Sequence, residues 1–203
     1  MNIPYRLLDW QKVKKTGRGY THRELTVVGL LKELAAEKPI ASFLNIGFHD
    51  FQDIRNRWWI DICRTNGIDW HILEVYPPNV ENFLKHAPPA DRHRITLGDV
   101  KNIAALFTGK FDVLMHWHGP EHLEREEFLA SLPDILSRTG RLAIFGCPNG
   151  REEQGQAYGN PFEQHLSFWT CADFQRLGFS THTVADKVPG HITAFKKLDC
   201  PHP

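Results

Sequence analysis

Several residues that can bind a polar ligand stand at the ends of short apolar runs. A carboxylate such as Glu74 can accept hydrogen bonds from both hydroxyls of a ribose, and Asp99 can accept one from an adenine amino group. Each acid also has a structural alternative: Glu74 could be an exposed carboxylate at a strand end or a cap for the next helix, and Asp99 could cap the helix expected from Val100. Together these types predict a nucleoside site, for which the candidate residues are Asn45, Gly47, His49, Glu74, Val75, Asp99, Val100 and His116.

Histidines are the candidate proton acceptors. His118 directly follows the apolar run 111–117, and His165 lies in the polar stretch before the last expected helix. Either imidazole could take a proton from a hydroxyl or an amine. His116, His118 and His122, with Glu121 beside them, also have the residue types that bind zinc or iron. We expect no bound metal here, because core or capping histidines are a simpler explanation of the cluster, and a metal site formed by His116, His118 and His122 is the alternative.

The elements that must position these residues alternate between strands and helices. Apolar runs predict five strands, at 41–47, 70–75, 93–97, 111–117 and 141–146. Helical spacing predicts six helices, at 22–37, 51–65, 79–86, 100–107, 124–136 and 168–177. Two further runs, at 179–185 and 191–197, predict an antiparallel hairpin around the turn 188–190.

This alternation predicts an α/β fold, with a doubly wound and mostly parallel seven-stranded sheet that ends in a C-terminal antiparallel hairpin. In such a sheet, ligands bind outside the carboxyl ends of the strands, near the point where the strand order reverses. The candidate residues should therefore meet in one crevice, around Asn45 to Asp50. Residues 1–40, a basic lead-in and a helix, precede the α/β domain at 41–203, and we expect one structural unit.

The composition of the chain limits the classes of binding partner that we expect. The 203 residues include 24 basic and 24 acidic side chains, so no basic footprint for nucleic acid is expected. No apolar run approaches the roughly 20 residues that span a bilayer. The N-terminal residues carry charges and a tryptophan where a signal peptide would be apolar, so we expect none there. The four scattered cysteines suggest neither a disulfide framework nor a zinc cage. We expect a cytoplasmic protein that acts on a small molecule, with no membrane or nucleic-acid partner.

The order of the motifs resembles that of class I S-adenosylmethionine-dependent methyltransferases. The run 43–47 is similar to the glycine motif of that family, Glu74 to its ribose-binding acid, and Gly98-Asp99 to its adenine-side acid. The runs 111–123 and 139–145 resemble its fourth- and fifth-strand motifs, while 163–169 and 177–179 resemble small-molecule members. The resemblance implies a Rossmann-like methyltransferase fold, S-adenosylmethionine as cofactor, a small-molecule acceptor, and His118 or His165 near that acceptor.

The first turn departs from the family pattern, which is an acid followed by three alternating glycines. This chain has Asn45, Gly47, His49 and Phe51 at the corresponding positions. We expect His49 and Phe51 to reroute the turn or to fill part of the pocket, since glycine permits close approach and positive φ. Asn45 also lacks the negative charge that usually faces the cofactor's amino group. The alternative function is therefore a methyltransferase-like protein that has lost cofactor binding and acts as a binding or regulatory subunit.

Tryptophans divide into two expected groups. Trp58 and Trp59 share helical spacing with other apolar residues, so we expect them in the core. Trp117, Trp169 and Phe162 follow a strand or lie near a loop. Of these, Trp117 and Trp169 are the expected walls of an acceptor pocket.

Overall fold

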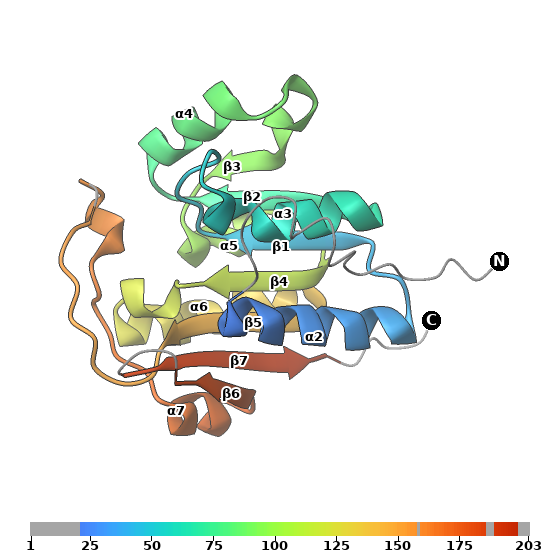
Figure 1. The fold of residues 1–203 in the computed structure, drawn as a ribbon. Coiled ribbons are helices and arrows are strands. Elements are labelled where there is room, and N and C mark those ends of the chain that lie inside the picture. Colours follow the sequence, from blue (N-terminus) through green and yellow to red (C-terminus); the bar gives the residue numbers. More distant parts are fainter. Residues whose placement is uncertain (1–20, 158, 186–188, 199–203) are drawn as a thin grey trace.

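The computed structural model describes residues 21–157, 159–185 and 189–198. Its sheet has seven strands in the order β3-β2-β1-β4-β5-β7-β6 (Figure 1). The strands are β1 (Ser42–Ile46), β2 (Asp69–Glu74), β3 (Ile95–Leu97), β4 (Phe111–Trp117), β5 (Thr139–Pro148), β6 (Ser180–Val184) and β7 (His191–Lys197). The first five strands pair in parallel, and β7 is antiparallel to both β5 and β6. The predicted sheet and its C-terminal hairpin are confirmed, while Val188 of the expected turn lies outside the described residues.

Helices cover both faces of the sheet (Figure 1). Side chains of α2, α3 and α4 pack in one apolar cluster, and those of α5, α6 and α7 pack in the cluster on the opposite face. The α-helices are α2 (His22–Glu37), α3 (Ile54–Asn66), α4 (Pro77–His86), α5 (Ile103–Leu106), α6 (Arg125–Ser137) and α7 (Cys171–Arg176). The short 3₁₀ turns are η1 (Pro89–Arg94), η2 (Val100–Asn102), η3 (Pro120–His122) and η4 (Pro161–Glu163).

Three helices differ from the sequence prediction for local reasons. α3 begins at Ile54 rather than at residue 51, because the chain first forms a loop in which Phe51 packs into the core. α7 begins at Cys171 rather than at 168, because Thr170 and Asp173 form a capping box there. The helix expected over 100–107 is divided into η2 and α5, with Asp99 capping the first of the two.

The helix α2 is bound to the sheet at both its side and its end. Thr21 and Glu24 form the predicted capping box. Its apolar side, which includes Leu31 and Leu34, lies in the same core cluster as the strand residue Phe43. At its C-terminal end, the Arg141 guanidinium of β5 donates to the Leu34 carbonyl at 2.7 Å and to two further carbonyls. The described part of the N-terminal segment therefore shares one core with the α/β domain.

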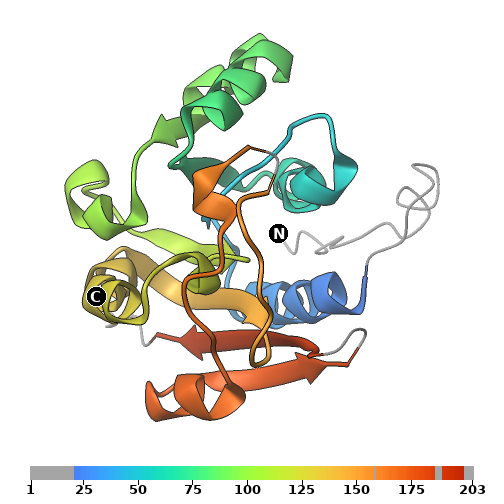
Figure 2. The ribbon, with the colours of Figure 1, turned by 90° about the vertical axis from the view of Figure 1, so that its left-hand side faces the viewer.

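The order of strands reverses at β1, which lies between β2 and β4. Loops that leave the two strands β1 and β4 at their carboxyl ends turn toward opposite sides, which opens a crevice there. Figure 2 views this edge of the sheet and shows the orange segment between β5 and α7, residues 149–170, crossing in front of it. The topology thus provides both a crevice and a segment that covers it.

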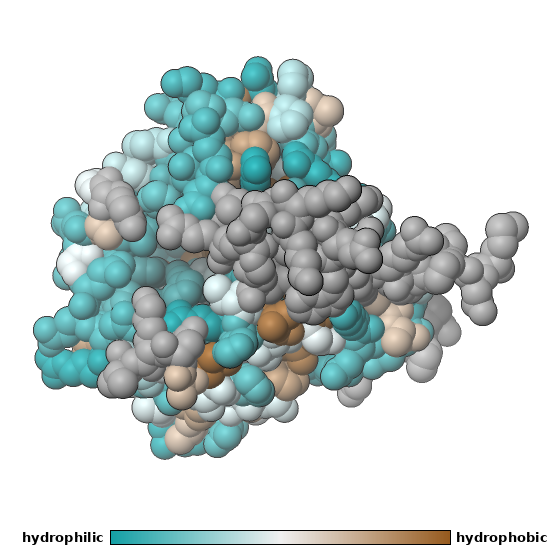
Figure 3. Space-filling view, viewed as in Figure 1, coloured by the Kyte–Doolittle hydropathy of each residue, from teal (hydrophilic) through white to brown (hydrophobic). Residues whose placement is uncertain are grey.

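On the face seen in Figure 3, the described surface is mostly hydrophilic, with small apolar patches. Within the described residues, none of the helices combines the length and the apolar character that crossing a membrane requires.

Candidate active site

A cavity of about 830 Å³ lies at the carboxyl ends of β1, β2 and β4. This volume is within the range of pockets that bind a cofactor or a drug-sized molecule. All eight candidate binding residues line it, namely Asn45, Gly47, His49, Glu74, Val75, Asp99, Val100 and His116. The structure therefore brings the predicted set together, and its role in binding remains a prediction.

The turn after β1 keeps one glycine where the backbone requires it. Gly47 has a φ of +87°, and its N–H donates to the Leu73 carbonyl of β2 at 2.9 Å. The Asn45 side-chain amide donates to the Gly47 carbonyl at 2.5 Å. Among the described residues, the other side-chain atom of Asn45, Oδ1, is buried without a hydrogen-bond partner. This turn therefore presents an unused acceptor at the cavity.

The two residues that replace the missing glycines, His49 and Phe51, lie in different surroundings. His49 lines the cavity. Phe51 is 5% exposed and packs edge-on against Phe83 of α4, with ring centroids 5.2 Å apart, and also contacts Phe48. Of the two expected outcomes, Phe51 therefore reroutes the turn into the core, and it does not line the cavity.

Glu74 is an acid of the cavity that three hydrogen bonds hold in place. Its carboxylate accepts hydrogen bonds from the Phe48 N–H at 2.6 Å, the Tyr76 N–H at 2.8 Å and the Asn79 side chain at 3.4 Å. Burial raises the pKa of Glu74 to about 7, although these hydrogen bonds work in the opposite direction. Two carboxylate oxygens can accept about four hydrogen bonds, so capacity remains for a ligand hydroxyl. Sequence reasoning missed Phe48 and Asn79, which fix this acid.

Asp99 caps a helical turn and also lines the cavity, and its role toward an adenine remains a prediction. Its carboxylate accepts from the Lys101 N–H at 2.9 Å and so caps η2, as the structural alternative required. It also lines the cavity and lies 3.5 Å from the Lys101 ammonium, which pairs with Glu127 of α6 at 2.9 Å. Asp99 is therefore a cap whose carboxylate reaches the ligand cavity.

His116, at the end of β4, is fixed by packing. Its ring occupies the space where a side chain on Gly119 would be, since a Cβ there would lie 1.9 Å from Nε2. Burial lowers the pKa of His116 to about 4, so this imidazole is neutral at pH 7. Its role is that of a neutral cavity wall.

His118 projects toward solvent at the cavity, with a left-handed backbone. Its φ is +51°, and its N–H donates to the Gly146 carbonyl of β5 at 2.8 Å. Its side chain is 43% exposed, and Nδ1 lies 3.3 Å from Oε1 of Glu121, a carboxylate that is 2% exposed. Burial alone would raise the pKa of Glu121, but the hydrogen bond from His118 and the nearby imidazoles lower it. An exposed imidazole oriented by a buried carboxylate is a common arrangement for a general base.

His165 does not line the cavity. Its Nδ1 lies 2.5 Å from the Glu152 carbonyl, and its ring centroid is 5.1 Å from that of His122. The metal alternative formed by His116, His118 and His122 is not assembled either. Within the described ranges, the three residues whose ligand atoms lie close enough together to hold a metal ion are Glu121, His122 and His165.

The aromatic residues follow the prediction in part. Trp58 and Trp59 are buried, as expected, and both also line the cavity, together with Trp117 and Phe162. The prediction for Trp169 was wrong, because this side chain is 1% exposed and packs between Phe128 and Phe174 of the core. Spacing in the sequence could not show on which side of the covering segment the indole lies.

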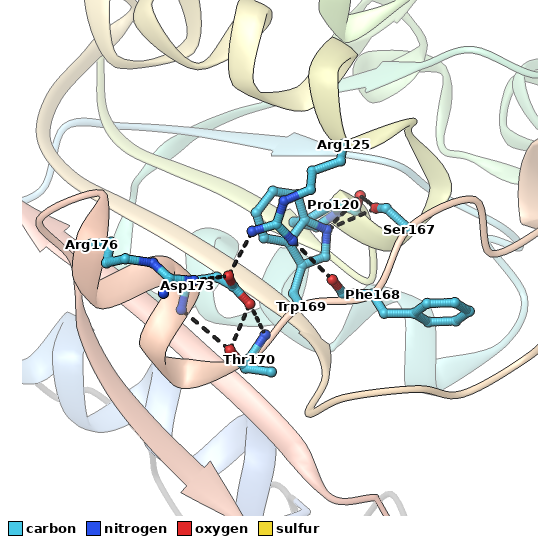
Figure 4. Close-up of polar contacts among 8 residues, drawn as sticks. All are labelled: Pro120, Arg125, Ser167, Phe168, Trp169, Thr170, Asp173 and Arg176. Carbon is cyan, nitrogen blue, oxygen red and sulfur yellow. Dashed lines mark hydrogen bonds and ion pairs between the residues drawn. The ribbon is translucent and has the colours of Figure 1, made fainter.

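A polar junction explains the position of Trp169 (Figure 4). Its indole N–H donates to the Pro120 carbonyl at 3.2 Å, and the Arg125 guanidinium lies 4.3 Å from its ring centroid. Arg125 also pairs with Asp173 at 2.6 Å. Although burial of Asp173 works against it, hydrogen bonds from Thr170 and the two arginines around it lower the pKa of Asp173 to about 2. The junction holds the covering segment to the chain after β4.

Comparisons with known proteins find similarity in structure but not in sequence. No family model and no curated protein matches the chain. A crystal structure of an S-adenosylmethionine-dependent methyltransferase from Archaeoglobus fulgidus superposes with a TM-score of 0.56 at 15% identity, covering 94% of this chain and 100% of that one. Magnesium protoporphyrin IX methyltransferase from Synechocystis PCC 6803, with bound S-adenosylhomocysteine, gives 0.59 at 14% identity, covering 94% and 93%.

A third structure, the complex of DhpI with S-adenosylhomocysteine, gives a TM-score of 0.54 at 14% identity and covers 98% of this chain and 91% of its own. With the strand order of the sheet, these superpositions decide the architecture. The chain has the class I methyltransferase fold. In this methyltransferase fold the cavity described above lies where the strand order reverses, beside Gly47 and Glu74.

Proposed function

We propose that this protein transfers a methyl group from S-adenosylmethionine to a small-molecule acceptor. The observation that carries the proposal is Glu74, a buried carboxylate at the tip of β2 that lies in the cavity and is hydrogen-bonded to the turn after β1. A carboxylate at this point of a doubly wound sheet can accept from both ribose hydroxyls of a nucleoside. Fold neighbours with bound S-adenosylhomocysteine support the same cofactor class.

The residues at the cavity fit the groups of this cofactor. Asn45 Oδ1 is buried and has no partner in the described part of the chain, so it can accept a hydrogen bond from the cofactor's amino group. Gly47 keeps the turn open for a close approach, because its side of the backbone carries no Cβ. Asp99 lies at the end of β3, where it can accept from an adenine amino group.

His118 is the proposed proton acceptor. When bound, the cofactor supplies an electrophilic methyl group on a sulfonium sulfur. His118 would accept the proton that the acceptor's hydroxyl or amine loses as its lone pair forms the new bond to the methyl carbon, while the carbon–sulfur bond breaks and S-adenosylhomocysteine leaves. Glu121 would hold the imidazole, because its carboxylate lies 3.3 Å from Nδ1, and Nε2 would then take the proton. Trp117 and Phe162 would form apolar walls for the acceptor.

Calorimetric titration with S-adenosylhomocysteine tests the cofactor assignment. We expect micromolar binding that is lost in Glu74→Ala and retained in Glu81→Ala, a matched change at an exposed carboxylate on α4. Heat that is absent in the wild-type protein would contradict the proposal. It would favour instead a binding or regulatory subunit that retains the fold without the cofactor.

A further inference from the structure

Three side chains beside the proposed site form a group whose residue types can bind a metal ion, and one of them, Glu121, also contacts His118. Glu121 and His122 belong to η3, after β4, and His165 belongs to the segment that covers the cavity. One ligand atom from each residue lies within 4.8 Å of the other two. Small rotations of the side chains would bring such a set to the metal–ligand distances of about 2.1 Å that zinc requires. We propose that Glu121, His122 and His165 bind a divalent transition metal ion, with zinc as the best match.

The hydrogen bonds of the two imidazoles involve Nδ1 and leave Nε2 of each ring available. Nδ1 of His122 lies 3.1 Å from the Gln164 carbonyl, and Nδ1 of His165 lies 2.5 Å from the Glu152 carbonyl. A carbonyl oxygen can only accept, so both Nδ1 atoms carry the proton and both Nε2 atoms keep a free lone pair. Histidines that bind metals are usually fixed in this way, with one ring nitrogen donating to a backbone carbonyl.

Glu121 offers a carboxylate oxygen that has no other use. Oε1 is the partner of His118, whereas Oε2 is buried without a hydrogen-bond partner in the described ranges. Leaving a buried carboxylate oxygen unpaired is costly, and a cation would compensate that cost. Two imidazoles with one carboxylate are a known zinc-binding set, which leaves at least one coordination position for water or another ligand.

The surrounding backbone already holds the three residues in place. The Glu121 carbonyl accepts from the Leu166 N–H at 2.8 Å and from the Ser167 N–H at 3.1 Å. Beside it, the Pro120 carbonyl accepts from Ser167 and Trp169, as Figure 4 shows. A metal ion here would add a coordinate link between the end of β4 and the covering segment. Because His122 also lines the cavity, the ion would stabilise the cavity wall.

The test is a titration of the metal-free full-length protein with Co²⁺ and Zn²⁺, followed by absorbance for cobalt and by calorimetry for both. The informative variants are His122→Asn and His165→Asn. Asparagine keeps a side-chain N–H near the Nδ1 position, so the bond to the backbone carbonyl is preserved while the Nε2 ligand is removed. The matched control is His182→Asn, at an exposed histidine on the edge strand β6.

We expect one ion per chain, with a cobalt spectrum typical of nitrogen and oxygen ligation. Either ligand variant should weaken binding by more than about 100-fold, since loss of a ligand costs more than loss of a group that orients it. The control should bind as the wild type does. Zinc should also slow proteolysis of residues 149–157 in the wild type but not in His165→Asn.

Absence of stoichiometric binding would overturn the proposal, and so would equal binding by the wild type and both ligand variants. Each variant is also titrated with S-adenosylhomocysteine. Retained cofactor binding with lost metal binding would show that the protein is folded and that the metal site alone is removed. Cofactor binding that fails in every protein, with metal binding intact, would overturn the proposed function and leave this site standing.

Discussion

At the scale of single residues, the two carboxylate oxygens of Glu74 accept the hydrogen bonds that hold the fold together, and they are also the proposed acceptors for the ligand. Its hydrogen bonds to Phe48, Tyr76 and Asn79 join the β1 turn to β2 and α4. The same carboxylate is the proposed ribose acceptor. Burial raises its pKa to about 7, so the ionised form that best accepts from hydroxyls is also the form that costs folding energy.

Stability should therefore depend on pH through Glu74. The folded pKa of about 7 lies above the value of 4.5 for an unburied glutamate, so the folded state keeps its proton longer. The contribution of Glu74 is fully favourable below pH 4.5 and is lost as the pH rises through 7, a change of about 3 kcal/mol. Urea denaturation of the wild type and Glu74→Gln at pH 5 and pH 8 measures it.

Buried histidines change the stability with pH in the opposite direction, and the comparison of wild type with Glu74→Gln cancels their contribution. Burial lowers the pKa of His71 and of His116 to about 4, so these two groups make both proteins less stable as the pH falls below about 6.5. The difference between wild type and variant leaves only Glu74. If that difference is the same at both pH values, the carboxylate is not buried as described.

Cofactor binding should have the reverse pH dependence. Ribose hydroxyls donate to the ionised carboxylate, and with a pKa of about 7 only a minor fraction of Glu74 is ionised at pH 6. We expect the affinity for S-adenosylhomocysteine to rise by up to about tenfold between pH 6 and pH 8. Calorimetry of Glu74→Gln should show weaker binding without this rise. A wild-type affinity that is flat across this range would remove Glu74 as the acceptor.

At the scale of elements, the same substitution, glycine to alanine, can be made at two positions that differ in backbone conformation but not in the space around them. The comparison therefore separates the effect of backbone conformation from that of packing. At both Gly29, in α2, and Gly47, after β1, an added Cβ would meet no neighbouring side chain of the described residues within 4 Å. Of the two, Gly47 alone has a positive φ, +87°. Gly29→Ala should stabilise the protein by about 0.5–1 kcal/mol, because alanine is the better helix former. Gly47→Ala should destabilise it by about 1–2 kcal/mol.

Thermal or chemical denaturation of both variants measures whether each substitution raises or lowers the free energy of unfolding. Gly47→Ala should also weaken binding of S-adenosylhomocysteine, whereas Gly29→Ala should leave it unchanged. If both substitutions changed the free energy of unfolding in the same direction, the left-handed conformation at Gly47 would not be needed for stability.

The same scale shows what the sequence could and could not predict. Apolar runs bounded by turn residues identified all seven strands. In central strands such as β1 and β4, burial on both faces leaves a continuous apolar signal, whereas the edge strands β3 and β6 are largely exposed or half-buried. The start of α3 was placed too early, since Phe51 has the spacing of a helical residue but packs from a loop. Partners such as Asn79 for Glu74 are set by tertiary contacts between elements, and local spacing carries no signal for them.

At the scale of the whole molecule, Arg141 connects parts that are far apart in the chain. Its guanidinium donates to carbonyls of Leu34, Lys38 and Pro39, about 100 residues away, and its side chain is 9% exposed. Arg141→Ala would leave three carbonyls at the end of α2 without these donors. We expect a loss of about 2–4 kcal/mol in the free energy of unfolding.

The control for this loss is Arg151→Ala, at a side chain that is 74% exposed. Exposed ion pairs contribute little, so the change there should be below about 1 kcal/mol. Equal effects of the two substitutions would show that Arg141 does not fasten α2 to the sheet. Neither charge balance nor spacing in the sequence distinguishes these two arginines, because only the folded arrangement brings α2 against β5.

The adjacency of β1 and β4 also has a kinetic consequence. Ser42 and Asp112, joined by a hydrogen bond between these strands, are separated by 70 residues. Such non-local pairing forms slowly, because the intervening chain loses conformational entropy before the contacts between the two strands contribute favourable energy. The cavity exists only once this pairing is complete, so S-adenosylhomocysteine should leave the refolding rate unchanged and slow unfolding alone. Chevron plots with and without the ligand should therefore share the folding arm and separate on the unfolding arm.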